Sequence, residues 1–345
     1  MIDISTQSLE PRRERVAIDR DKTIVIIGEG ETNKKINQVE YYNLYEEVKE
    51  MYGECDLSLA FKQAKEIGVP HVFVVNIKRK EDYIDLIELL KQHDFGYICP
   101  LNLRLSDYFY DLANDDKKTY YIDYFNRQMN YLNNSTIVVT EKHASLYEDI
   151  DHFIDDMKDK LLAFKNILNS LFNGRNTYFV ANNLKDYHYA NIALASALCS
   201  SELNQYPRYN YGEAIFDIDS WDIGLNEIIY FKNHNDINTT VDNLVNLKAE
   251  VSPEKIIMID RVLKYIVRKI NLEQFIGRNM RAHTKLQIER TLEEFFNRLI
   301  DFVITRYEIL NINFVKDIPG SGRVEVLIDI WAIGSLEKVT VKVEA

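Results

Sequence analysis

A glycine pair behind the first apolar run of the chain is the sequence's nearest approach to a known chemical motif. Residues 23–27 form a run rich in β-branched side chains, and Gly28-Glu29-Gly30 follows it directly. A dinucleotide-binding turn needs a third glycine and presents backbone amides to a pyrophosphate. Here residues 32–38 are polar, and Glu29 would repel a pyrophosphate. We interpret the turn as a strand end, and an α/β nucleotide-binding enzyme that uses Gly28 and Gly30 is the alternative.

No other residue spacing indicates catalysis or metal binding. The patterns of a P-loop, a zinc protease, a nucleophile elbow and an EF-hand are absent from the sequence, and its seven histidines show no i, i+4 pair. Cys55, Cys99 and Cys199 lack CxxC spacing, which predicts free thiols. Neighbouring acids such as Asp155 and Asp156 would point to different sides of a helix. We therefore predict no catalytic residue, no metal, no cofactor and a protein that is not an enzyme.

A basic stretch interrupts an otherwise acidic chain. Residues 254–290 hold nine lysines or arginines against four acids, although the whole chain has a net charge of −12. This asymmetry indicates an acidic partner surface. Arg278, Arg281 and Lys285 share one face if the stretch is helical, so they could meet one partner together. A solvated helix face and a nucleic-acid-binding module are the alternatives, and the acidic charge elsewhere disfavours direct nucleic-acid binding.

Tyrosine is abundant, with 22 residues, and seven of them cluster in two places. They are Tyr41, Tyr42 and Tyr45, and then Tyr120, Tyr121, Tyr124 and Tyr131. Such amphipathic aromatics suit either a core or a subunit contact. Base stacking is disfavoured because the aspartates between residues 107 and 123 would repel phosphates.

The end of the chain alternates between valine and polar residues. Val339, Val341 and Val343 would form one apolar face of a final strand. An end strand with free main-chain groups invites pairing with another chain, and the charges of Lys338 and Lys342 would discourage random aggregation. The same strand could complete a sheet of its own chain, and the sequence leaves both options open.

Ahead of that strand, helical and strand patterns alternate. Helical periodicity appears at residues 57–67, 83–90, 146–172 and 189–198, and strand-like runs appear at 71–77, 95–99, 136–140, 177–181, 214–218 and 227–231. This alternation predicts an α/β layer architecture.

The last third of the chain has a different pattern. Ser252-Pro253 is typical of a helix start and marks the expected domain boundary. An apolar stripe at helical spacing then predicts one continuous helix, with Ile288, Leu292, Phe295, Phe296, Leu299, Phe302 and Val303 on one face. After a turn at residues 319–322, Val324, Val326, Ile328 and Ile330 alternate with other residues and predict a strand. A second, α+β domain is expected here.

Composition sets the broad class. The chain has 345 residues, 46% of them hydrophobic, which predicts a globular protein of about two domains. No apolar run approaches the roughly 20 residues of a membrane helix, and the first residues have no secretory apolar region, so we expect folding in a cytoplasm. Short alternations, Ile2 with Ile4 and Val16 with Ile18, predict an extended N-terminal arm.

Three segments together resemble the sheath proteins of contractile, phage-type tails. They are residues 22–31 (KTIVIIGEGE), residues 51–77, where Tyr52-Gly53 precedes LSLAFKQAKEIGVPHVFVVNI, and residues 254–345, which end in GRVEVLIDIWAIGSLEKVTVKVEA. The resemblance lies in the order and spacing of these segments over about half the chain. It implies an α/β outer domain and a C-terminal α+β sheath domain with extended N- and C-terminal arms. The expected division is 1–22, 23–250, 251–334 and 335–345.

The resemblance also implies a function and partners. A sheath subunit forms a helical homo-oligomer of stacked rings around an inner tail tube, and contraction drives the tube through an envelope to deliver a genome or effector. The baseplate and a tail terminator would be further partners, and the protein would belong to a virion tail that is assembled in the host cytoplasm, without membrane insertion.

Subunits that slide past each other without separating need flexible links, and strand exchange at the chain ends meets this need. Twenty extended residues span up to about 66 Å, enough to reach a neighbour. The residues expected to exchange or receive strands are Ile2, Ile4, Val16, Ile18, Val324, Val326, Ile328, Ile330, Val339, Val341 and Val343. Arg278, Arg281 and Lys285 are then expected to face the tube.

Overall fold

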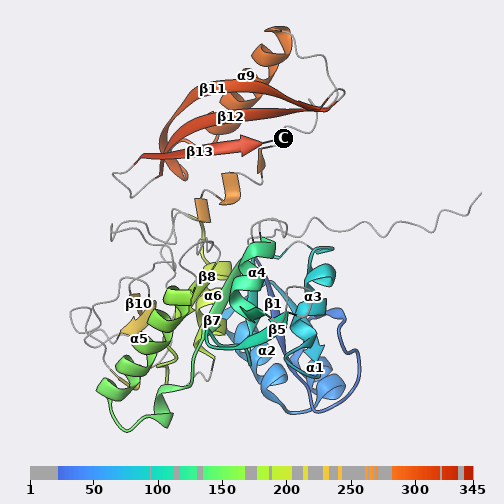
Figure 1. Cartoon of the computed structure of the whole chain (residues 1–345), viewed down its shortest axis with the longest axis vertical. Helices are drawn as coiled ribbons and strands as arrows, with labels where there is room; N and C mark the ends of the chain where they lie inside the picture. The colour runs from blue at the N-terminus through green and yellow to red at the C-terminus, as the bar shows by residue number, and fades with distance from the viewer. Residues whose placement is uncertain are drawn as a thin grey trace, which may run out of the picture.

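The computed structural model places an α/β region and a C-terminal sheet with one helix beside each other, with the sheet at the top of Figure 1. The residues that it describes are 22–93, 95–111, 117–129, 135–167, 177–185, 189–203, 213–216, 228–232, 240–242, 261–262, 264–266, 269–270, 282–318, 321–332 and 338–344. The predicted N-terminal arm and the predicted boundary at residue 251 lie outside them.

A six-stranded sheet forms the centre of the α/β region. Its strands are β1 (Thr23–Glu29), β2 (Val39–Tyr42), β3 (His71–Ile77), β4 (Tyr97–Pro100), β7 (Thr136–Thr140) and β8 (Thr177–Val180), in the order β2-β3-β1-β4-β7-β8. All neighbours are parallel except the edge strand β2, which is antiparallel to β3. Continuous β-branched runs such as β1 are typical of parallel strands that are covered on both faces.

Helices cover both faces of this sheet. On one face lie α1 (Tyr45–Tyr52), α2 (Asp56–Ile67) and α6 (Ala190–Ser200), which pack on Ile24 and Ile26 of β1. On the other lie α3 (Asp82–Leu90), α4 (Tyr121–Met129) and α5 (Ile150–Ile167), whose buried residues share a cluster with Val25 and Ile27. The alternation of side chains along β1 therefore divides the region into two buried clusters.

The C-terminal region has a buried cluster of its own. Helix α9 (Ala282–Asn297) packs Ile288, Leu292 and Phe296 against a three-stranded antiparallel sheet. Its strands are β11 (Ile304–Ile318), β12 (Ser321–Ala332) and β13 (Lys338–Glu344), in the order β11-β12-β13 (Figure 1).

Smaller elements complete the described chain. Strands β5 (Tyr108–Asp111) and β6 (Lys117–Tyr120) form an antiparallel hairpin, as do β9 (Tyr230–Lys232) and β10 (Thr240–Asp242), and a 3-10 turn spans Ala144–Leu146. None of the described helices is long and apolar enough to cross a bilayer.

The predicted α/β fold with an α+β C-terminal part is confirmed, and individual elements differ from the prediction. The helix expected from residue 146 begins at Ile150, behind the 3-10 turn. In the strand expected at 214–218, Ala214 makes an isolated bridge to Leu184. The apolar stripe was expected to lie on one helix, but α9 ends at Asn297. Beyond it the backbone turns at Asp301 (φ 66°), and Phe302 is 44% exposed.

Candidate assembly surfaces

The C-terminal sheet brings together the two sets of residues that were predicted to pair. In β12, Val326, Ile328 and Ile330 are fully buried against α9. The antiparallel register places Val343 opposite Val326, Val341 opposite Ile328 and Val339 opposite Ile330. The register thus pairs each of the three predicted valines with a buried residue of β12. Val324 lies on the same strand, opposite Phe314 of β11.

The partner of β13 is the strand that the sequence indicated, but in the same chain. All seven residues of β13 pair with residues 325–331 of β12. Within the described residues, β13 is therefore the last strand at one edge of the sheet, with one side of its main chain paired. A single chain contains no neighbour, so exchange of β13 between subunits stays a prediction.

The other predicted contact residues are only partly described. Ile2, Ile4, Val16 and Ile18 lie outside the described residues, as do Arg278 and Arg281. Lys285 is exposed on α9, between the buried Thr284 and Ile288, and Arg290 is exposed on the same helix. The described part of α9 thus presents cations to solvent and apolar residues to the sheet.

The basic stretch is not one continuous charged surface, which corrects the interpretation drawn from charge counting. Arg261 is 5% exposed and Lys264 is 8% exposed. The guanidinium of Arg261 donates hydrogen bonds at the end of α6, and the ammonium of Lys264 donates to Thr136 Oγ1 at 2.6 Å. These two cations contact their own chain, so they cannot face an acidic partner.

The glycine turn after β1 is filled by side chains of the same chain. A Cβ atom on Gly28 would lie 2.8 Å from Leu101 Cδ1, and one on Gly30 would lie 3.1 Å from Asn76 Oδ1. The Gly30 amide donates to Asn76 Oδ1 at 2.8 Å, and Asn102 Nδ2 donates to Glu29 Oε1 at 2.6 Å. The amide and the space that a pyrophosphate would use are thus occupied, and the structure gives no support to the nucleotide-binding alternative.

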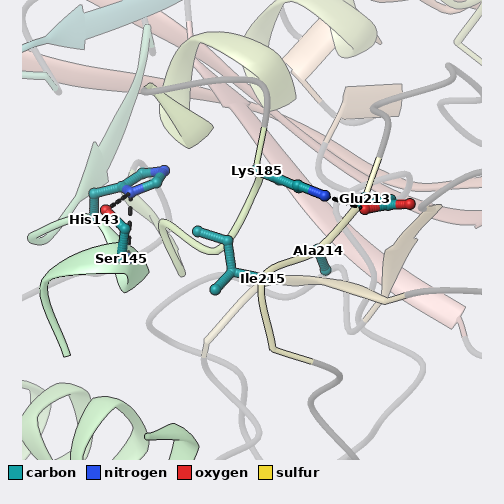
Figure 2. Close-up of a pocket in the computed structure, with 6 residues that line it drawn as sticks. All are labelled: His143, Ser145, Lys185, Glu213, Ala214 and Ile215. Carbon is teal, nitrogen blue, oxygen red and sulfur yellow. Dashed lines mark hydrogen bonds and ion pairs between the residues drawn. The ribbon is translucent and has the colours of Figure 1, made fainter. Parts of the chain in front are cut away.

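A pocket of about 480 Å³ lies at the carboxyl ends of β7 and β8 (Figure 2). His143 contacts Ser145 Oγ through Nδ1 at 2.7 Å and the Leu184 carbonyl through Nε2 at 2.8 Å. Across the pocket, Lys185 pairs with Glu213 at 2.7 Å (Figure 2). His143 is also the N-terminal cap of the 3-10 turn, since its ring accepts from the Ser145 amide. The short distance between His143 and Ser145 is therefore explained by capping of this turn.

A buried carboxylate behind β7 was not singled out in the sequence. Glu141 is 2% exposed, accepts from the Leu105 amide at 3.0 Å and pairs with Lys160 Nζ at 3.2 Å. Burial raises the pKa of Glu141 above that of an ordinary glutamate, although Lys160, the Leu105 amide and Arg104 act in the opposite direction. The group joins the β4 loop, β7 and α5, which is a structural role.

The tyrosines divide between core and surface. Tyr120 and Tyr121 are buried, whereas Tyr41 and Tyr108 are partly exposed and Tyr110 is 60% exposed. Tyr131 lies outside the described residues. Lys118 lies over the ring of Tyr108, 3.9 Å from its centre, so the hairpin β5–β6 carries an exposed aromatic surface that the sequence did not distinguish from core.

Known structures share this fold over the whole chain. A crystal structure of a sheath tail protein from Desulfitobacterium hafniense aligns with all of this chain and all of its own, with a TM-score of 0.60 and 13% identity. The contracted sheath of the extracellular contractile injection system PVC gives a TM-score of 0.63 at 12% identity, covering 92% of this chain and 90% of that one. The contracted helical sheath of the anti-feeding prophage gives 0.59 at 9% identity, with the same coverage.

These likenesses confirm the resemblance at the level of the fold, and they include the C-terminal region as well as the α/β layers. No protein-family profile and no curated protein sequence matches the chain.

Proposed function

We propose that this chain is a structural subunit of a contractile tail sheath, which polymerises helically around an inner tube and contracts to drive the tube through a target envelope. The observation that carries the proposal is the full-length fold likeness to sheath tail proteins. The edge position of the final strand supports it, because a helical polymer needs a link that each subunit both offers and receives.

The proposed link is an exchange of β13. In the closed chain, β13 pairs with β12 from Lys338–Trp331 to Glu344–Glu325. The β12 of a neighbour offers the same sequence and the same register, so exchange would keep every ladder hydrogen bond and every apolar contact. The two arrangements then differ in free energy mainly through chain entropy and through the new contacts between subunits. Residues 333–337 connect the strands and would cross between subunits.

A second link would use the N-terminal arm. Residues 1–22 precede β1, and Ile2, Ile4, Val16 and Ile18 would place apolar side chains on a neighbour's sheet. In this proposal the subunit consists of an N-terminal arm (1–22), an outer α/β domain (23–250), an inner sheath domain (251–334) and a C-terminal arm strand (335–345). Sliding of the domains during contraction would leave both tethers paired, and no cofactor or turnover is needed.

The tube would face the inner domain. Lys285 is exposed on α9, and we propose that it meets acidic groups of the tube together with Arg278 and Arg281. The baseplate and a tail terminator would close the two ends of the sheath. In this proposal the protein belongs to a virion tail, or to a related injection particle, assembled in the host cytoplasm. Replacing the three cations with glutamate should impair assembly on the tube, and unchanged assembly would refute this contact.

Removal of residues 337–345 tests the exchange itself. The truncated chain should keep its six-stranded sheet, since β13 belongs to the separate C-terminal sheet and pairs with β12, and should stay monomeric in sedimentation velocity. The unmodified full-length chain is the control, and it should form polymers at the same concentration. Normal sheaths from the truncated chain would contradict the proposed link.

A further inference from the structure

One short segment between the two regions contributes side chains to both. Residues 261–262 and 264–266 are helical. Val262 and Ile266 are buried in the C-terminal cluster with Ile288, whereas Arg261 and Lys264 are buried against the α/β region. Residues at i, i+3 and i, i+4 share a helix face, so this one turn presents an apolar face to one region and a cationic face to the other.

Arg261 binds the carboxyl end of α6. Its Nη2 donates to the Leu198 carbonyl at 2.8 Å and to the Ser201 carbonyl at 3.0 Å, and its Nη1 donates to Ser201 Oγ at 3.1 Å. The last carbonyls of a helix lack donors within the helix, and a cation is favourable at the negative end of the helix dipole. The guanidinium therefore adds donors at this helix end, where the Leu198 carbonyl also accepts from Ser201 Oγ at 3.2 Å.

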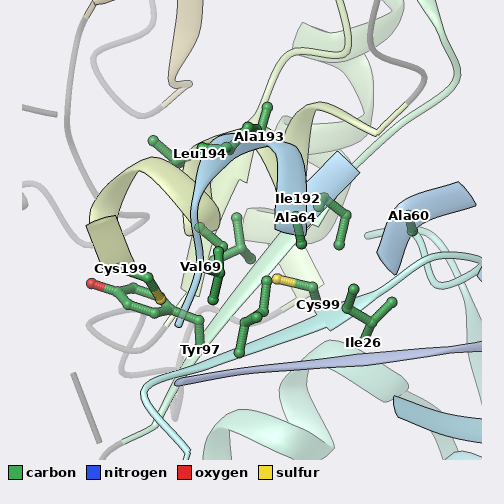
Figure 3. Close-up of a cluster of buried hydrophobic side chains, with 14 of the residues drawn as sticks. Ile26, Ala60, Ala64, Val69, Tyr97, Cys99, Ile192, Ala193, Leu194 and Cys199 are labelled. Carbon is green, nitrogen blue, oxygen red and sulfur yellow. The ribbon is translucent and has the colours of Figure 1, made fainter. Parts of the chain in front are cut away.

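Helix α6, to which Arg261 binds, is buried and held at both ends. Its residues from Ala190 to Cys199 are buried, and its small side chains allow close packing on α2 and the sheet, in the buried cluster that Figure 3 shows in part. At its other end, the Ala190 amide donates to Asn182 Oδ1 at 3.1 Å. Side chains from other elements thus bind both ends of α6.

Lys264 makes the second attachment, at the amino ends of two parallel strands. Its Nζ donates to Thr136 Oγ1, the first residue of β7, at 2.6 Å. The same ammonium lies 5.6 Å from the ring centre of Tyr178 in β8. A buried cation is tolerated when its donors are satisfied by fixed partners, so this contact specifies one position of the segment against the sheet.

We propose that Arg261 and Lys264 form a latch that fixes the C-terminal region on the α/β region and makes the two unfold as one cooperative unit. The two regions have separate buried clusters, and Leu203, which directly follows α6, reaches the C-terminal cluster from the α/β side. Polar attachment by the latch therefore supplements a small apolar contact among the described residues. The proposal concerns the single chain and holds whether or not the chain forms a sheath.

The test follows the two regions separately in the full chain at a concentration where it is monomeric. The sequence holds two tryptophans, and Trp331 lies in β12, so a Trp221→Phe background leaves one fluorescent reporter in the C-terminal sheet. Far-UV circular dichroism reports mainly on the helices. In this background we expect coincident thermal midpoints from the two probes, which indicate one cooperative unit.

Arg261→Met keeps the apolar stem and removes the guanidinium. The fluorescence midpoint should fall by roughly 5 °C and separate from the circular dichroism midpoint, because two carbonyls lose their donor. Arg290→Met is the matched control, since Arg290 is exposed on α9 in the same region, and it should leave both midpoints within about 1 °C. Arg261→Lys keeps the charge but cannot reach all three acceptors, so it should fall between these results.

A double-mutant cycle keeps the proposal testable if Arg261→Met fails to fold. Lys264→Met and Thr136→Val each remove one side of a hydrogen bond, and their effects on the fluorescence midpoint should be clearly less than additive when combined. Ser201→Ala should lower the same midpoint by removing one acceptor of Arg261. Coincident, unshifted transitions in Arg261→Met, or additive effects of Lys264→Met and Thr136→Val, would overturn the latch.

Discussion

The two sheets of this protein differ in strand order, in the faces that helices cover and in what lies at their edges. In the parallel sheet, sequence-distant strands are neighbours, both faces are covered by helices, and the β8 edge bonds to Ile229. In the C-terminal sheet, strand order follows chain order, one helix covers one face, and the last residues of the described chain form the edge. Under the proposed exchange, the second sheet would offer this edge strand to a neighbour.

Polar groups follow the same division. Asn191 of α6 donates to the Pro100 and Val138 carbonyls, where β4 and β7 no longer pair, and Asn76 holds the turn after β1. These side chains thus form hydrogen bonds with backbone groups of the α/β region itself. This difference teaches that stability and assembly should be separable by substitution. The following predictions test the separation first in assembly and then in stability, where they run from the largest expected effect to the smallest.

The largest effect on assembly is expected from a charge in β13. Val341→Asp would place a carboxylate on the face that β13 shares with Ile328, and this should weaken strand pairing by about 2 kcal/mol or more. The critical concentration for assembly should rise by roughly 30-fold or more, as measured by sedimentation.

Lys342→Asp is the matched control for this prediction, since the next residue points to the other face of the strand. It should assemble far better than Val341→Asp. Equal loss of assembly in both variants would mean that the apolar face of β13 does not carry the contact.

The second prediction concerns stability of the α/β region. Phe61 of α2 is fully buried, so Phe61→Ala should lower the free energy of unfolding by about 3–5 kcal/mol. Leu59→Ala on the same helix removes a side chain that is 38% exposed and should cost less than about 1 kcal/mol. Urea unfolding of the monomer measures both. Similar values for the two would break the proposed division between a closed core and its surface.

Two glycines give a finer comparison within the same region. Gly53 has φ 88° and ψ −177°, and an added Cβ would collide with the Glu31 carboxylate, so Gly53→Ala should cost about 2–3 kcal/mol. Gly68 has φ 99° and ψ 26°, with its nearest neighbour, Ser200 Oγ, at 3.8 Å from the added atom. Gly68→Ala should therefore cost about 1 kcal/mol, from backbone strain alone. The melting temperature of Gly53→Ala should therefore be lower than that of Gly68→Ala, and the reverse order would contradict this comparison.

The smallest effect is a pH dependence from Glu141. Because burial raises its pKa in the folded chain, the folded state binds the proton more tightly than the unfolded state. The free energy of unfolding that Glu141 contributes should decrease as pH rises from the unfolded pKa, about 4.3, through the folded pKa, and stay constant above it.

Glu141→Gln removes this titration. The stability difference between the wild type and the variant should shift in favour of the wild type as the pH is lowered from 7 to about 4.5, as read from urea unfolding at each pH. A shift in the opposite direction would mean that the ion pair with Lys160 outweighs burial in setting the pKa.

The sequence predicted elements where one physical pattern dominated. Strands β3 and β7 have the bounds that their β-branched runs indicated. Strand β11 was missed because it contains register shifts between Ile304 and Arg306, Ile309 and Asn311, and Lys316 and Ile318, which break the alternation of side chains. The end of α9 was predicted too late because the apolar spacing continues through a turn that only the backbone conformation of Asp301 reveals.

The candidate sites show a similar limit. Two alternating runs predicted the pairing of β13 with β12, but pairing within one chain and the proposed pairing between chains would use the same residues, so no sequence pattern distinguishes them. Counting charges placed Arg261 and Lys264 on a partner-facing surface, because a charge count cannot show that the acceptors are carbonyl and hydroxyl groups of the same chain.

The most direct test of the central claim is negative-stain electron microscopy of the purified full-length chain at high concentration, beside the chain truncated before residue 337. The account predicts hollow cylinders from the full-length protein and small separate particles from the truncated one. Small, monodisperse particles from the full-length chain, or cylinders from both, would contradict it.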